Sequence, residues 1–268
     1  MKSVLASALL ISTTMSASVF AAETDMNSLV EAAKKEGAVY SVGMPDSWAN
    51  WKDTWADLKA NYGLEHQDTD MSSAQEIAKF AAEKKNATAD IGDVGFAFAN
   101  VAVKKGVTQP YKPSTWSEIP EWAKDKEGHW ALAYTGSIAF ISNNNLVENP
   151  PKSWSDLLNG DYKVSLGDVG SAAQANNAVL AAAFANGGDE TNLQPAIEFF
   201  AKLAQKGNLS LTDPSAANIE KGEVEVAVLW DFNALNNRDK FGRDRFSVNI
   251  PQDGSVISGY TTIINKFA

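Results

Sequence analysis

Small hydroxyl, acidic and tryptophan side chains gather where predicted strands end, which is where open α/β sheets bind their ligands. A serine at a helix start can cap the helix, and the free N–H groups there can also bind an anion. Asp93 and Asp231, together with the faces of Trp48 and Trp230, would suit a cation instead. The candidate ligand contacts are Ser47, Trp48, Ser72, Ser73, Asp93, Thr135, Ser137, Ser171, Ala172, Trp230 and Asp231.

Catalytic and metal-binding patterns are missing from the sequence. It contains no G-x-S-x-G, H-E-x-x-H or G-x-x-x-x-G-K-[ST] motif. There is no cysteine for a thiolate site, and the two histidines, His66 and His129, stand apart. Asp93 paired with Asp231 is the remaining arrangement for acid–base chemistry. We therefore predict a binding protein with no catalytic residue, no metal and no cofactor, rather than a hydrolase.

The first half of the chain alternates strands and helices, which is typical of a parallel sheet flanked by helices. The expected strands are 38–42, 64–68 and 90–94. A helix is expected to start at Trp48, because Trp48, Trp51, Trp55 and Leu58 fall on one helical face. Serine caps are expected at three helix starts, namely at Ser47, at Ser72 or Ser73, and at Ser171.

A second α/β set follows, with strands predicted at 162–166, 209–212 and 224–230. Two long extended runs, 130–143 and 256–264, flank this set. Fourteen extended residues span about 45 Å, enough to pass from one domain into another. We therefore predict two α/β lobes joined by two extended hinge strands, with the ligand cleft between them. Lobe 1 is predicted at residues 22–135 and is completed by 255–268, and lobe 2 is predicted at 136–254.

The N-terminus has the layout of a secretory signal peptide. Lys2, the apolar run Val4–Ile11 and a V-x-A pattern ending at Ala21 precede a polar segment. We expect residues 1–21 to be cleaved near Ala21 and the protein to be soluble in the periplasm. Its formal net charge of −10 disfavours nucleic acid and anionic membrane surfaces as partners.

Four stretches resemble the extracellular solute-binding proteins of ABC importers, in the branch that includes ferric-iron, thiamine, polyamine and phosphorylated-organic binders. They are Leu29–Gly37 before the first strand, the P-x-S-W-x-D-L-L block within Pro150–Leu158, Gly167-Asp168 before an alanine-rich helix, and Gly222–Val228 before Trp230. The resemblance implies a type II-like periplasmic-binding-protein fold that closes on its ligand, acts as a monomer and delivers the ligand to ABC permease subunits. Relatives usually continue beyond a segment like 259–268, so we expect either a fragment or a missing last packing layer.

The ligand class stays open at this stage. An anionic or phosphorylated organic suits the helix starts with Thr135 and Ser137, although no Lys or Arg lies in the candidate loops. A polyamine-type cation suits the aspartates and tryptophans. Bare ferric iron is disfavoured, because Tyr162 and Tyr260 do not form the tyrosine pair that the resemblance implies for iron binders. The residues favour the anionic organic; a cation or iron chelate, and a sensor or chemoreceptor role on the same fold, are the alternatives.

Overall fold

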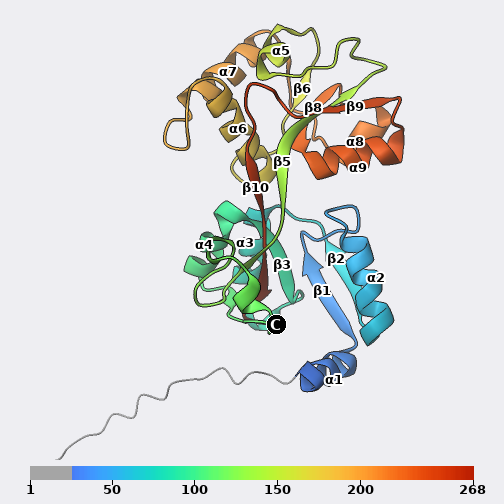
Figure 1. Cartoon of the computed structure of the whole chain (residues 1–268), viewed down its shortest axis with the longest axis vertical. Coiled ribbons are helices and arrows are strands. Elements are labelled where there is room, and N and C mark those ends of the chain that lie inside the picture. The colour runs from blue at the N-terminus through green and yellow to red at the C-terminus, as the bar shows by residue number, and fades with distance from the viewer. Residues whose placement is uncertain (1–25) are drawn as a thin grey trace, which may run out of the picture.

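The computed structural model describes residues 26–268, so the predicted signal peptide lies outside the described residues. Two groups of helices and strands are joined by two long strands, β5 (Ala131–Asn143) and β10 (Ile257–Asn265), which run side by side between them (Figure 1). This arrangement is the predicted two-lobed α/β fold with two extended connections. The predicted lobe boundaries themselves stay a prediction. No helix within residues 26–268 is long and apolar enough to cross a membrane.

The first lobe is built from an N-terminal run of alternating elements. Its elements are α1 (Met26–Glu36), β1 (Ala38–Val42), α2 (Trp51–Tyr62), β2 (Glu65–Thr69), α3 (Ser73–Glu83), β3 (Ile91–Gly95), α4 (Phe96–Lys105) and β4 (Thr108–Gln109), with 3₁₀ turns at Lys84–Asn86, Trp116–Glu118 and Glu121–Ala123. The second lobe lies between the two long strands in the sequence. Its elements are α5 (Trp154–Asn159), β6 (Val164–Ser165), α6 (Ala173–Ala185), α7 (Gln194–Gln205), β7 (Leu209–Ser210), α8 (Ala216–Lys221), β8 (Val226–Trp230), α9 (Asp231–Phe241) and β9 (Phe246–Asn249).

The sheets of the two lobes meet in one strand. The strand order is β2-β1-β3-β10-β5-β8-β6-β7, with β4 paired to β10 and β9 paired to β5. The first part of β5, to Ser137, pairs with β10, whereas the part from Ile138 to Asn143 pairs with β8 and β9. The two sheets are therefore continuous through β5 rather than separate. Parallel pairing, as predicted, holds for β1 with β2 and β3, and for β6 with β7 and β8.

Local chemistry explains where the site-bearing helices begin. Ser72 is the N-cap of α3, and its backbone N–H donates to Gln75 Oε1 at 2.9 Å. Ser72 therefore occupies the N-cap position predicted for it. The cap predicted at Ser47 is wrong, because α2 begins only at Trp51, after Asn50 in the left-handed conformation. The cap predicted at Ser171 is also wrong, since Ala172 occupies the N-cap of α6.

Each lobe has its own hydrophobic core. In the second lobe, the alanine-rich helix α6 buries six alanines, and their small side chains let it lie close to the sheet and to α7. The first lobe buries Val42, Phe80 and Val94 between its helices and sheet. These two rigid bodies hold the loops at their facing ends, where the candidate site lies.

Candidate ligand-binding cleft

A cavity of about 90 Å³ lies where the two lobes face each other. It is lined by residues of the first lobe, of the start of α6 and of β10: Gly43, Trp48, Asp70, Met71, Ser72, Ser73, Glu76, Asp93, Ala172, Ala173, Gln174 and Tyr260. This is several times the space that one water molecule needs, so the cavity suits a small solute. Two larger hollows, of about 460 and 540 Å³, lie within the second lobe, and none of the predicted site residues lines them.

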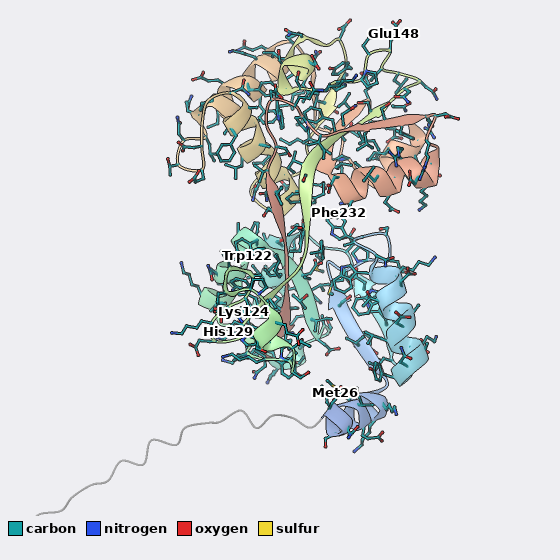
Figure 2. The ribbon with its side chains drawn as sticks, in the orientation of Figure 1. Met26, Trp122, Lys124, His129, Glu148 and Phe232 are labelled. Carbon is teal, nitrogen blue, oxygen red and sulfur yellow. The ribbon has the colours of Figure 1, made fainter. Side chains whose placement is uncertain are left out.

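The lobes touch each other around this cavity. The backbone N–H of Ala74 donates to the carbonyl of Ser171 across the cleft at 3.3 Å. On another side, Asn236 Nδ2 donates to the carbonyl of Ser47 at 3.1 Å. Phe232, at the end of the second lobe that faces the first, meets the ring of Trp48 edge-on at a centroid distance of 5.7 Å (Figure 2). The cavity is therefore enclosed by contacts that depend on how the lobes are placed.

Two buried carboxylates project into the cavity from neighbouring elements. Glu76, on the inner side of α3, is 1% exposed and accepts a hydrogen bond from the backbone N–H of Asp93. Its carboxylate fills the space beside Gly43 and Gly92, where a Cβ would lie within 2.5 and 2.6 Å of its oxygens. Glycine at these two positions therefore makes room for the acid.

Asp93 lies at the end of β3 and is likewise 1% exposed. Its Oδ2 atom accepts hydrogen bonds from Trp51 Nε1, at 3.2 Å, and from the hydroxyl of Tyr134. Within the described part of the chain, the second oxygen of each acid, Glu76 Oε2 and Asp93 Oδ1, has no hydrogen-bond partner. Two buried acceptors thus remain free at the cavity.

A third acid stands behind this pair. Asp68, on β2, accepts hydrogen bonds from the Ser41 hydroxyl at 2.5 Å and from the Met44 backbone N–H at 2.9 Å. The Ser41 hydroxyl also lies 2.8 Å from His66 Nε2, and the His66 ring stacks on Trp55 at 3.8 Å. These contacts hold Asp68 in place, so its negative charge acts on the cavity from a fixed position.

Burial raises the pKa of the Glu76 and Asp93 carboxyl groups well above their ordinary values. For Glu76, the charges of Asp93 and Asp68 raise the pKa further. For Asp93, the hydrogen bonds from Tyr134 and Trp51 oppose the effect of burial without cancelling it. The site therefore holds carboxyl groups that are costly to ionise until a compensating charge arrives.

Hydrogen-bond donors face the same cavity. The indole Nε1 of Trp48 and the hydroxyl oxygen of Ser72 are shielded from solvent and have no partner among residues 26–268. The starts of α3 and α6 also reach the cavity, through Ser72, Ser73 and Ala172. Helix starts carry partial positive charge and free N–H groups, so this side suits an anionic or polar acceptor group.

Metal binding finds little support in the geometry. Within the described range, no three His, Cys, Asp or Glu side chains are placed to hold a metal ion together. The residues lining the cavity include no Lys, Arg or His in the described chain. The cavity thus presents carboxylate acceptors on one side and N–H and O–H donors on the other.

Comparison with known proteins decides the family. Residues 86–267 match the family of bacterial extracellular solute-binding proteins. The chain belongs to this family. The resemblance seen in the sequence motifs is therefore confirmed.

Two relatives carry names that describe their role. A Salmonella typhimurium protein, named as a candidate 2-aminoethylphosphonate-binding periplasmic protein, is 27% identical over 196 residues, which is 70% of this chain and 56% of the relative. A Sinorhizobium fredii protein, named as a candidate ABC transporter periplasmic-binding protein, is 31% identical over 38% of this chain and 30% of the relative. The solute-binding protein described here thus spans about half the length of the first of these relatives.

Solved structures confirm the fold of the solute-binding protein. The periplasmic binding protein AfuA from Actinobacillus pleuropneumoniae, with fructose-6-phosphate bound, matches with a TM-score of 0.69 at 19% identity, over 86% of this chain and 74% of AfuA. A periplasmic thiamin-binding protein matches with a TM-score of 0.66 at 15% identity, over 86% and 73% of the two chains. The type II-like two-lobed fold predicted from the sequence is confirmed.

Five of the predicted contacts line the cavity of the solute-binding protein: Trp48, Ser72, Ser73, Asp93 and Ala172. The other six do not line it: Ser47, Thr135, Ser137, Ser171, Trp230 and Asp231. Ser47 and Thr135 are exposed. The backbone N–H of Ser137 donates to Asp231 Oδ1 at 3.1 Å, so Asp231 is used within the hinge. The Ser171 hydroxyl donates to the Asp168 carboxylate.

Trp230, which was predicted to contact the ligand, does not line this cavity. Its side chain is fully buried, and its Nε1 donates to the Tyr260 hydroxyl at 3.2 Å. It packs in an aromatic cluster with Phe232 and Tyr260, where the two long strands cross between the lobes. Trp230 therefore supports the site from behind.

Several lining residues were missed by sequence reasoning, namely Asp70, Glu76, Gln174 and Tyr260. Glu76 carried the clearest signal. It lies one turn after the Ser72 cap, beside the apolar Ile77 and Phe80, so an acid occupies the buried side of α3. An unpaired acid on a buried helix face is a candidate functional group.

The raised carboxyl pKa values predict how stability depends on pH. The unfolded chain releases the Glu76 proton near pH 4.3, the ordinary value, whereas the folded protein keeps it to higher pH. This contribution to stability is present at low pH and is lost as the pH rises through the folded-state pKa. We expect Glu76→Gln to raise the thermal midpoint more at about pH 8 than at about pH 5, as measured by circular dichroism.

Other titratable groups near Glu76 also contribute to the pH dependence of stability, so the effect of Glu76 is measured as a difference between variants. Asp68, Asp70 and Asp93 face it with the same sign of charge, and Tyr260 lies nearby on β10. His66 acts in the opposite direction, since burial lowers its pKa. Asp57→Asn, on the exposed side of α2, is the matched control and should leave the pH profile of the wild type unchanged. If Glu76→Gln shifts the thermal midpoint by the same amount at pH 5 and at pH 8, the raised pKa of Glu76 is contradicted.

Proposed function

We propose that this protein captures a small organic solute in the periplasm and delivers it to the permease subunits of an ABC importer. The observation that carries the proposal is the enclosed cavity between two lobes that are linked by β5 and β10. A solute that contacts both lobes stabilises their closed arrangement, and a permease can recognise that arrangement. The names of the relatives, one for aminoethylphosphonate binding and one for an ABC transporter, support the same role.

The proposed solute carries an anionic group, such as a phosphonate or phosphate. The starts of α3 and α6 meet at the cavity from opposite lobes, and Trp48 Nε1 and Ser72 Oγ lack partners there. An anion bound between them would hydrogen-bond to both lobes at once. AfuA was solved with a sugar phosphate bound, which agrees with this choice.

The protein is proposed to act without catalysis, as a monomer, after removal of an N-terminal signal peptide. Its family consists of binding proteins. A sensor role on the same fold is the competing function, because a closed pair of lobes can also present its surface to a receptor. Stimulation of the partner transporter's ATPase by the loaded protein, in reconstituted vesicles, would separate transport from sensing.

A solute screen tests the proposal directly. We expect the purified protein to be stabilised by one class among phosphonates, sugar phosphates, polyamines, thiamine and ferric salts. A solute at 100 times its Kd adds about 2.7 kcal/mol to the free energy of unfolding, which a thermal-shift assay detects easily. Calorimetry then gives the affinity. If no class shifts the unfolding midpoint, the solute-capture proposal fails.

A further inference from the structure

Two buried carboxyl oxygens on residues that line the cavity have no hydrogen-bond donor within residues 26–268. Glu76 Oε2 and Asp93 Oδ1 belong to side chains that are 99% buried, and both side chains line the cavity. A buried carboxylate oxygen without a donor is destabilising by itself. A buried polar atom without a partner in a native structure calls for one from outside the chain, such as a water, an ion or a ligand.

Neither acid is free to turn towards another partner. Glu76 is held between Gly43 and Gly92, and Asp93 is fixed by Trp51 and Tyr134. Both carboxyl groups are therefore held in fixed positions at the cavity wall. Preorganised acceptors favour a donor whose position is set by the rest of the solute.

The charge around these oxygens shows what kind of donor fits. Asp70 also lines the cavity, and Asp68 lies behind it, so two further acids add their negative charge to that of Glu76 and Asp93. The described lining contains no Lys, Arg or His that would neutralise them. A neutral donor would leave this negative charge uncompensated, whereas an ammonium group brings a positive charge and three N–H donors.

We infer that the solute carries a protonated amine that binds between Glu76 and Asp93. This inference rests on the proposed function and deepens it. The amine lies at the carboxylate side of the cavity, and the anionic group of the same solute lies at Trp48, Ser72 and the helix starts. The favoured solute class is thus a short zwitterion with an amine at one end and an oxyanion at the other.

Matched probes separate the two ends of the solute. Calorimetry at neutral pH would compare 2-aminoethylphosphonate with ethylphosphonate, which lacks the amine, and with 1,2-diaminoethane, which lacks the anion. We expect 2-aminoethylphosphonate to bind at least about 100-fold more tightly than ethylphosphonate, because the latter leaves a desolvated acid pair without its counter-charge. Binding should also release protons, seen as a dependence of the measured heat on the buffer.

Two isosteric variants locate the amine. Glu76→Gln and Asp93→Asn are each expected to weaken 2-aminoethylphosphonate binding by about 100-fold and to change ethylphosphonate binding by less than about threefold. Asp57→Asn removes the same charge from the exposed side of α2 and should not change either affinity. Circular dichroism of both cavity variants checks that they fold.

The possible results separate a failure of the amine site from a failure of the proposed solute-capture function. Equal affinity for the phosphonates with and without the amine would overturn the amine site and leave solute capture standing. If Mg²⁺ or Ca²⁺ alone stabilises the protein as much as 2-aminoethylphosphonate does, the amine site is overturned and a metal site takes its place. Binding of none of these probes, nor of any class in the broader screen, would overturn the amine site together with solute capture.

Discussion

Gly95→Ala is expected to weaken solute binding about 10- to 100-fold while both lobes keep their folds. A Cβ at Gly95, at the end of β3, would lie 2.2 Å from the Cβ of Ala173, at the start of α6 in the other lobe. The backbone at Gly95, with φ −52° and ψ 145°, suits alanine, so the clash arises only between the lobes. Overpacking of this kind costs roughly 1–3 kcal/mol. Because the clash exists only when the lobes are closed, it would destabilise the closed state relative to the open state.

The reciprocal substitution provides the control for this prediction. Ala173→Gly removes the opposing methyl group, so the double variant Gly95→Ala/Ala173→Gly should regain most of the affinity. Calorimetry on the four proteins gives the coupling between the two positions directly. Additive effects, with no rescue in the double variant, would show that the lobes do not close on each other at this point.

Trp230→Ala is expected to lower the free energy of unfolding by about 3–5 kcal/mol. The side chain is fully buried in the core of the second lobe, stacks on Phe232 at 6.3 Å and donates to the Tyr260 hydroxyl. Removing it leaves a cavity and an unpaired hydroxyl. Urea unfolding followed by circular dichroism would measure the loss.

Trp122→Ala is the matched control for this substitution. Trp122 lies on the first lobe with 66% of its surface exposed (Figure 2), so its removal should change stability by less than about 0.5 kcal/mol. Wild-type stability for Trp230→Ala, combined with lost solute binding, would restore the sequence-based expectation that Trp230 contacts the solute.

Much of the fold was predictable because it depends on local patterns. Strand β1 and the two long connections, β5 and β10, follow from apolar runs with clear boundaries. Helix α9 was missed, since its sequence Asp231–Phe241 is polar and has little amphipathic character. Strand β9 is short and pairs only with a distant part of β5, so nothing in its own sequence marks it.

The candidate site was only partly predictable, because it is made by contacts between distant elements. Asp93 followed from the rule that ligands bind at strand ends. Glu76 did not, since its role depends on the space that Gly43 and Gly92 leave beside α3. Trp230 does not line the cavity, because the end of a strand does not show which side its last residue faces. Long-range packing decides such questions.

The separation in sequence between β10 and its partner strands has a consequence for biosynthesis. It lies between β3 and β5 in the sheet, and Thr261 pairs with Val94, 167 positions earlier. Until residues 257–265 have left the ribosome, β3 and β5 lack the strand between them, however long ago they were made. Nascent chains therefore expose an unfinished sheet from the synthesis of β5 until β10 emerges, and chaperones that shield strand edges should bind them in that interval.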